Sequence, residues 1–272
     1  AAGNYQGAAY SLEKSLSGRP DFLPALAAMV DVEIRAGELD KAEARARGIA
    51  QQHPQRGIGH LLQADVAWAK GQRPAALDLY RKALKIEPST DTMLRLHAAV
   101  LRQEGPPAAL AVVQQWSKAH PEDLRARKEL ADAQARAGNF KAAQAVYEDM
   151  LKTRPKDALL LNDLANVLLR QDPKAALPVA EKALAAAPSN ALVIDTAGWV
   201  LFHNGQSERA LQLLRDARLR RPGEPTIRYH LAAVLAKTGR SAEAKAELHA
   251  ALAAAPQFEG SAEAQSLLKS LP

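Results

Sequence analysis

The 272-residue chain contains no cysteine, and only 4% of its residues are aromatic. Without cysteine it has no disulfide framework, no iron–sulfur cluster and no thiolate-rich zinc site, and its redox compartment stays open. No apolar run reaches the roughly 18 residues that would indicate a membrane-spanning helix. We therefore expect a folded chain that spans no bilayer.

Sequence motifs of catalysis are also missing. The chain has no glycine-rich phosphate loop, no dinucleotide fingerprint, no H-E-x-x-H zinc motif and no G-x-S-x-G nucleophile turn. Its seven histidines show none of the spacings that metal sites require. We predict a chain that is not an enzyme and that has no metal, no cofactor and no small-molecule substrate.

The composition favours closely packed helices. Apolar residues make up 47% of the chain and charged residues 24%, a mixture typical of folded proteins. Alanine accounts for 58 of the 272 residues, which suits helices whose backbones approach each other closely. The net charge of +6 mildly favours acidic partners but is small for a dedicated nucleic-acid binder of this size.

Prolines divide the chain into units of nearly constant length. Successive prolines in one set are 33 or 34 residues apart. The set consists of Pro20, Pro54, Pro88, Pro121, Pro155, Pro188, Pro222 and Pro256. Proline cannot continue a helix and disfavours helical dihedral angles in the residue before it, so each one marks a helix end. A fixed period of this length predicts a repeat protein.

Each unit is divided by a second marker. Seventeen residues after the first seven prolines stand, in order, Gly37, Gly71, Gly105, Gly138, Asp172, Gly205 and Gly239. Twelve residues before every proline stands an alanine, from Ala8 to Ala244. The apolar residues between these markers recur at i, i+3, i+4 and i+7, as in amphipathic helices. Each unit is thus predicted to be helix A, a turn, helix B and a proline stop.

This pattern resembles the tetratricopeptide repeat over essentially the whole chain. The small residue of the motif in helix A matches Ala64, Ala98, Ala131, Ala165, Gly198 and Ala232. The large aromatic residue that usually begins helix A is absent. The resemblance implies an all-α, right-handed α-solenoid whose A helices line a concave groove.

The period predicts a single array of about seven and a half units. Residues 1–20 form a half repeat with helix B only, and residues 257–272 form a capping helix with an apolar face of Ala264, Leu267, Leu268 and Leu271. The full repeats between them are predicted at 21–54, 55–88, 89–121, 122–155, 156–188, 189–222 and 223–256.

The late repeats carry amides and aromatic rings on the face of helix A that we expect to line the groove. Amides pair with peptide backbones, and exposed aromatic rings form binding hot spots. The predicted partner-binding residues are Asn162, Asn166, Arg170, Asp195, Trp199, Phe202, His203 and Tyr229. In the alternative interpretation, Trp199 and Phe202 fill space between A helices, beside the close contact that Gly198 allows.

A secondary basic patch is predicted in the middle repeats. It consists of Arg95, Arg102, Arg125, Lys128 and Arg136. The alternative is an ordinary solvated face with intervening acids, because isolated surface charges need no function.

Two narrower resemblances bear on the partner. The carboxylate clamp of chaperone-binding tetratricopeptide proteins does not assemble, because Lys128 is followed one turn later by Asp132 and Asn162 by Asn166. The run 195–201 and the later Tyr229-His230-Leu231-Ala232 are similar to the C-terminal repeats of bacterial envelope proteins, including the lipoprotein of the PEP-CTERM/exopolysaccharide system. That resemblance implies a periplasmic or outer-membrane-associated location.

The sequence therefore predicts a non-catalytic scaffold that binds a protein or peptide segment in the groove, possessing no membrane span. The resemblance adds a role in envelope or exopolysaccharide secretion assembly. Two alternatives stay open: electrostatic binding of nucleic acid or acidic polysaccharide through the basic patch, and a role as the regulatory arm of a larger enzyme.

Overall fold

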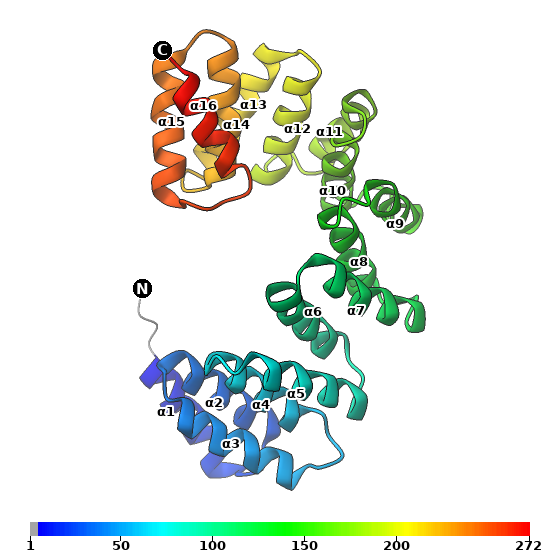
Figure 1. Ribbon diagram of the computed structural model, residues 1–272, viewed down its shortest axis with the longest axis vertical. Helices are drawn as coiled ribbons and strands as arrows, with labels where there is room; N and C mark the ends of the chain where they lie inside the picture. The colour runs from blue at the N-terminus through cyan, green and yellow to red at the C-terminus, as the bar shows by residue number, and fades with distance from the viewer. Residues whose placement is uncertain (1–4) are drawn as a thin grey trace. The chain divides into compact units, whose positions relative to one another are not determined.

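The computed structural model describes residues 5–272, so the first four residues of the predicted half repeat lie outside the described range. Sixteen α-helices and no strand occur in the described range (Figure 1). This confirms the predicted all-α helical repeat. The chain forms two compact units, residues 1–133 and 134–272, and the boundary falls inside α8.

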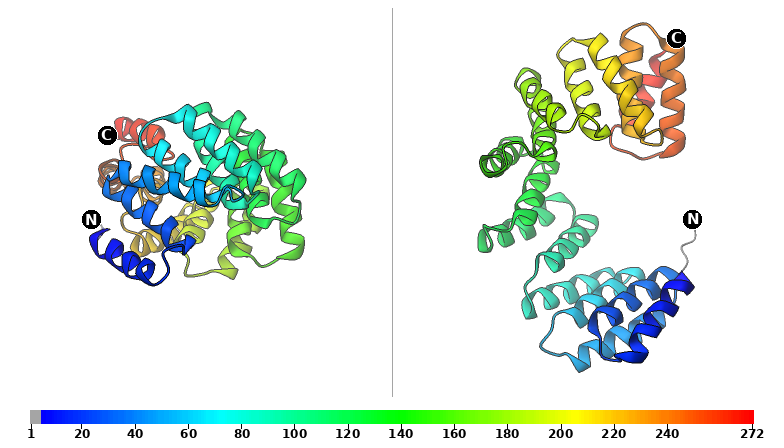
Figure 2. Two further views of the ribbon diagram at one scale, coloured as in Figure 1. Left: turned by 90° about the horizontal axis from the view of Figure 1, so that it is seen from below. Right: turned by 180° about the vertical axis from the view of Figure 1, so that it is seen from behind.

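Unit 1 contains α1 (Tyr5–Gly18), α2 (Leu23–Ala36), α3 (Leu39–Gln52), α4 (Ile58–Ala69), α5 (Arg73–Ile86), α6 (Thr90–Glu104), α7 (Pro106–Ala119) and most of α8 (Leu124–Arg136). Unit 2 contains α9 (Phe140–Thr153), α10 (Ala158–Leu169), α11 (Pro173–Ala186), α12 (Ala191–His203), α13 (Ser207–Arg220), α14 (Pro225–Lys237), α15 (Ser241–Ala254) and α16 (Ser261–Ser270). The helices from α1 to α7 and those from α9 to α16 each pack on their neighbours in the chain, as the right view of Figure 2 shows. No helix of residues 5–272 is long and apolar enough to cross a bilayer.

The turns between A and B helices depend on glycine. Six of the predicted turn glycines have positive φ angles between 77° and 89°. An L-amino acid with a side chain is strained in this left-handed region, whereas glycine is not. At the one turn without glycine, Asp172 has a negative φ angle. Its side chain accepts a hydrogen bond from the backbone N–H of Lys174 at 2.9 Å, which caps α11.

The alanine column is buried between the packed helices. Its members from Ala42 to Ala244 are at most 1% exposed in every B helix from α3 to α15. Ala8 is the exception, because α1 has no buried residue. A methyl side chain at this position lets each B helix approach its A helix closely, and larger side chains pack on either side.

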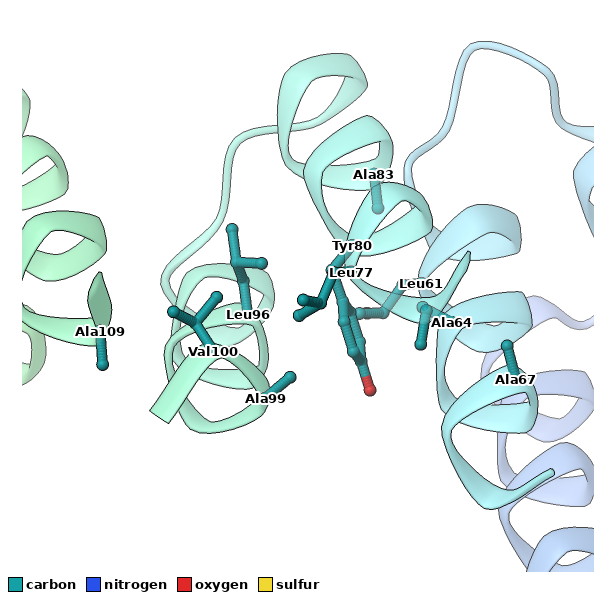
Figure 3. Packing of buried hydrophobic residues seen from close by; sticks show 11 residues of the cluster. Leu61, Ala64, Ala67, Leu77, Tyr80, Ala83, Leu96, Ala99, Val100 and Ala109 are labelled. Carbon is teal, nitrogen blue, oxygen red and sulfur yellow. The ribbon is translucent and has the colours of Figure 1, made fainter. Parts of the chain in front are cut away.

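Figure 3 shows such packing in unit 1, where Leu61 and Ala64 of α4 face Leu77 and Tyr80 of α5, and Leu96 of α6 lies beyond them. Burial of an aliphatic side chain of this size contributes about 1.5–3 kcal/mol. Repeat proteins depend on such contacts between neighbouring helices, because no repeat buries its apolar face alone.

The predicted position of the small motif residue is wrong in α6. The structure leaves the predicted Ala98 of α6 exposed. The buried His97 instead stands seven residues after the helix start, the position of Ala165, Gly198 and Ala232, and its Nδ1 lies 2.9 Å from the backbone oxygen of Ala109. α6 begins two residues after Pro88, whereas α10, α12 and α14 begin three residues after their prolines, and Gly105 alone separates α6 from α7. The helix is therefore turned by one residue, about 100°, from the register that the prolines predict. Figure 3 shows Ala99 on the side of α6 that faces Tyr80.

The C-terminal helix α16 completes the core of unit 2. Its Ala264 is fully buried, and Leu267, Leu268 and Leu271 pack on a cluster that includes Leu235 of α14 and Leu248 of α15. α16 thus covers apolar surface of the last hairpin that would otherwise face water.

Candidate functional site

Three A helices of unit 2, α10, α12 and α14, lie next to one another. Side-chain hydrogen bonds join them. The amide of Asn166 on α10 donates to the hydroxyl oxygen of Thr196 on α12 at 3.3 Å. Nδ1 of His230 on α14 lies 3.0 Å from both carboxylate oxygens of Asp195 on α12. These bonds fix which side chains of the three helices face one another.

Each of these helices presents an equivalent row of side chains at i, i+4, i+7 and i+11, a spacing that places them on one helix face. We call these twelve residues the A-helix row: Leu159, Asp163, Asn166 and Arg170; Leu192, Thr196, Trp199 and His203; Thr226, His230, Ala233 and Lys237. Leu159 and Leu192 are 50% and 41% exposed although both are large and apolar. An exposed apolar pair at equivalent positions of neighbouring helices suggests a contact surface.

Trp199 is the centre of an aromatic cluster. Its ring is nearly parallel to that of His230, with the centroids 4.1 Å apart and the planes 10° apart. The rings of Phe202, His203 and Tyr229 have centroids 5.3, 4.6 and 5.8 Å from that of Trp199. We call Trp199, Phe202, His203, Tyr229, His230 and Phe258 the aromatic cluster. Stacked and edge-on rings of this kind stabilise each other beyond simple area burial.

Asp195 holds His230 in place. The carboxylate is buried, with a 9% exposed side chain, and His230 is its partner across the α12–α14 contact. A hydrogen bond from Nδ1–H fixes the plane of the imidazole, and Trp199 stacks on that plane. The pair therefore determines the orientation of the indole although neither side chain is on the outer surface of the cluster.

The segment before α16 forms the far side of the cluster. The ring of Phe258 has its centroid 6.4 Å from that of Tyr229. Gly260 has a φ angle of +95°, and a Cβ atom added there would lie 3.1 Å from the Tyr229 ring. Glycine is required at this position by its backbone conformation, and its missing side chain leaves the space that Tyr229 occupies.

The protonation states of the cluster follow from its burial. Burial, and then the nearby His230, lowers the pKa of His203 below its ordinary value. Burial, and then the charge of Glu263, raises the pKa of Tyr229. Near pH 7 the cluster therefore presents a neutral imidazole at His203 and a protonated phenol at Tyr229.

The structure separates the predicted partner-binding residues into exposed and buried ones. Asn166, Arg170 and His203 are exposed, and Trp199, Phe202 and Tyr229 are partly buried. Asn162 and Asp195 are only 7% and 6% exposed, so their side chains face the protein. Oδ1 of Asn162 is buried without a hydrogen-bond partner.

The predicted site residues did not include several residues of this region, among them His230 and Phe258 of the cluster and Leu159 and Leu192 of the row. His230 follows the selected Tyr229 directly, and its pairing with Asp195 across two helices has no sequence spacing of its own. Leu159 and Leu192 stand at equivalent positions of adjacent repeats, four residues after their prolines. This repeated position of a leucine was the sequence signal that could have identified them.

Most members of the predicted basic patch have a nearby carboxylate. Arg95 pairs with Asp65, Arg125 with Asp91 at 2.7 Å and Lys128 with Asp132 at 2.9 Å. Arg102 is exposed, and Arg136 also has an interaction partner. Carboxylates so close to the cations weaken the attraction that they would exert on a polyanion. In the described part of the chain, no group of three or more metal-ligating side chains is placed to hold a metal ion.

Comparison with known families identifies the repeat. One tetratricopeptide repeat model matches residues 1–66 and 201–271, and a second matches residues 99–158 and 128–191. The first alone covers just over half of the chain. The chain belongs to the tetratricopeptide repeat family, whose members are generally non-catalytic scaffolds that bind peptides or proteins.

Solved structures share the fold at low sequence identity. Yeast Tom70 is 15% identical with a TM-score of 0.67, over 98% of this chain and 58% of its own. A chain of the APC/C hetero-tetramer Cut9–Hcn1 is 17% identical with a TM-score of 0.62, over 98% of this chain, and this chain spans about half (52%) of its length. The thermophilic protein TTC0263 of Thermus thermophilus is 24% identical with a TM-score of 0.59, over 66% of this chain and 100% of its own.

A search of curated proteins found no significant match to the chain. Identities of this size show the fold alone, so the partner has to be argued from the side chains of the chain itself.

Proposed function

We propose that this protein is a non-catalytic scaffold and that unit 2 binds a segment of a partner protein along the A-helix row, with Trp199 as the anchor. The observation that carries the proposal is the aromatic cluster around Trp199, which stays partly exposed although the other rings of the cluster surround it. Large, rigid and partly exposed aromatic side chains dominate the binding energy of protein interfaces.

The rest of the row supplies complementary contacts. Leu159 and Leu192 offer apolar surface, and the exposed amide of Asn166 can donate to and accept from a peptide backbone. In this proposal the buried Asn162 and Asp195 do not contact the partner directly. Asp195 supports His230, and no contact of Asn162 with the partner is needed.

Two further functions predicted from the sequence, an envelope role and polyanion binding, are secondary proposals. A role in envelope or exopolysaccharide secretion assembly rests on the resemblance of residues 195–201 and 229–232 to envelope proteins. Polyanion binding is disfavoured by the ion pairs of Arg95, Arg125 and Lys128. A strong dependence of partner capture on salt would restore it.

The test is photo-cross-linking from the row. A benzophenone amino acid is placed at position 166 or 203, both exposed on the row, and in the control at position 219 of α13, where Leu219 is 70% exposed. After irradiation in native extract, the adducts are identified by mass spectrometry. We expect one adduct shared by positions 166 and 203 and absent at 219.

The same adduct should be lost when Trp199→Ala and Tyr229→Ala are combined, while Leu219→Ala leaves it unchanged and circular dichroism shows a folded chain. Adducts that are the same at all three positions, or that survive the double substitution, would contradict the proposal.

A further inference from the structure

The C-terminal end of the A-helix row carries a line of basic side chains. Arg170, His203 and Lys237 occupy the same position in three successive repeats, separated by 33 and 34 residues. All three side chains are exposed. Because α10, α12 and α14 lie next to one another, these side chains stand in line across the three helices.

These side chains have no carboxylate partner among residues 5–272. The guanidinium of Arg170 lies 5.6 Å from the ring centroid of Phe140 on α9, which holds it without neutralising it. The imidazole of His203 rests edge-on against Trp199, at 4.6 Å. Aromatic rings therefore position Arg170 and His203. The charges of Arg170 and Lys237 stay available to a ligand, and the neutral imidazole of His203 can donate a hydrogen bond to it.

The opposite end of the row is apolar on α10 and α12, whereas α14 has Thr226 there. Leu159 and Leu192 belong to the first turns of α10 and α12, and Trp199 lies between them and the basic line. A ligand that contacts both ends of the row would therefore place acidic groups beside the basic line and apolar groups beside Leu159 and Leu192.

We propose that the occupant of the row is an extended acidic segment of a partner protein. Its carboxylates pair with Arg170 and Lys237 and accept a hydrogen bond from His203, and its apolar side chains pack on Trp199, Leu159 and Leu192. This inference rests on the proposed function, which leaves the chemistry of the partner open. It commits to charge complementarity as the basis of recognition.

Helix spacing sets the expected spacing of the acids. Packed helices have axes about 8–10 Å apart. A chain in the polyproline II conformation rises about 3.1 Å per residue and repeats its orientation every three residues, which is about 9.3 Å. A segment that crosses the three helices therefore brings one side chain in every three to the basic line, so we expect Glu or Asp at i, i+3 and i+6.

A basic residue at the end of a helix also interacts favourably with the helix dipole. Arg221 provides the matched control, because it is exposed and stands at the C-terminal cap of α13, outside the row. Removing Arg221 should cost the same dipole interaction without affecting the ligand.

The experiment uses three fluorescein-labelled peptides of about ten residues and the full chain. The first peptide has Glu at every third position with Leu, Phe and Pro between. The second has the same composition with its Glu residues contiguous, and the third has Gln in place of each Glu. Fluorescence anisotropy measures the Kd of each peptide for wild type, Arg170→Ala/Lys237→Ala, Trp199→Ala and Arg221→Ala.

We expect the first peptide to bind wild type about fivefold or more tightly than the other two, in line with two exposed charge pairs. Arg170→Ala/Lys237→Ala should lose about that factor, Trp199→Ala should lose more, and Arg221→Ala should match wild type. Equal binding of the Gln peptide, an unchanged Kd in the Arg170/Lys237 variant, or no binding of the first peptide would each overturn the inference.

The proposed function is judged separately by the cross-linking experiment. A shared adduct at positions 166 and 203 that contains no acidic segment would contradict the acidic-segment inference but would support the proposed scaffold function. The absence of any row-specific adduct would remove both.

Discussion

The A helices of the two units use their outward side chains differently. In unit 1, charges on neighbouring A helices pair with each other: Asp65 of α4 with Arg95 of α6, and Asp91 of α6 with Arg125 of α8. In unit 2, the equivalent face carries stacked rings, and Arg170 and Lys237 form no ion pair in the described chain. The same repeat backbone thus supports a face whose charges satisfy one another and a face on which Arg170 and Lys237 form no ion pair.

The difference extends to the polar contacts between helices. Asp65 also accepts a hydrogen bond from the Tyr80 hydroxyl at 2.6 Å, so two partners share its carboxylate. Asp195 has His230 as its partner, and that partner in turn supports Trp199. The first network ends within the helices, whereas the second ends at the partly exposed ring of Trp199. The following changes test this contrast in order of expected effect.

The largest effect is expected for Gly59→Ala in unit 1. A Cβ atom at Gly59 would lie 2.4 Å from the Cα atom of Ala50, so the backbones of α3 and α4 would have to separate. We expect a loss of roughly 2–3 kcal/mol in the stability of unit 1. Hydrogen exchange should speed up in α3 and α4 and stay unchanged in α12 and α14, because repeats contact only their neighbours.

Gly198→Ala is the matched control in unit 2. There the added Cβ atom would meet the side chain of Leu214 at 2.8 Å, and a side chain moves more easily than a backbone. Its effect should be clearly smaller. Equal losses, or faster exchange in both units after either change, would show that the two units do not respond separately.

The next effect is expected for His230→Ala. This change leaves the buried carboxylate of Asp195 without its partner, which costs about 1–3 kcal/mol. The melting temperature should fall, and acrylamide should quench Trp199 more strongly in a background with Trp68→Phe and Trp116→Phe. The double variant Asp195→Leu/His230→Ala should recover part of the stability, because no carboxylate remains unpaired. If quenching does not change, His230 does not position the indole.

A smaller effect is expected for Arg95→Ala in unit 1. The Asp65 carboxylate keeps the Tyr80 hydroxyl as a partner, and burial already raises the pKa of Asp65. We expect a loss of about 1 kcal/mol at most, measured by urea unfolding, and no change in capture of the cross-linked partner. Loss of capture would place part of the binding surface in unit 1 and break the contrast.

The smallest effect is expected for His203→Gln. Because the folded chain lowers the pKa of His203, the unfolded chain takes up a proton at higher pH than the folded one. Below the ordinary pKa of about 6.5, wild type should therefore lose a little stability as the pH falls through the lowered pKa. His203→Gln should remove this part of the acid sensitivity and leave the stability at pH 8 unchanged. Melting curves from pH 8 to pH 5 measure both.

Most of the fold was predictable, because helix ends and turns have local causes. Proline stops helices, and glycine adopts the left-handed angles of six turns, so both leave a signal in the sequence. The register of α6 was not predictable from these markers. Its shift by one residue to His97 depends on how Gly105 alone joins two helices, which is a matter of packing.

The site was predictable in part. Trp199, Tyr229 and Asn166 follow from residue type and helix face. The burial of Asn162 does not, because it depends on how neighbouring helices cover one position of α10. The contact of His230 with Asp195 depends on the distance between two helices 35 residues apart in sequence, and a single sequence carries no record of that distance.

The segment before α16 limits how the chain can be rebuilt. Gly260 and Phe258 contact Tyr229, and α16 covers Leu235 and Leu248. In many repeat designs a terminal cap is exchangeable, and further repeats are inserted in front of it. Here an insertion after Pro256 would carry the cap away from Tyr229, so lengthening the array at this end would also alter the proposed binding surface.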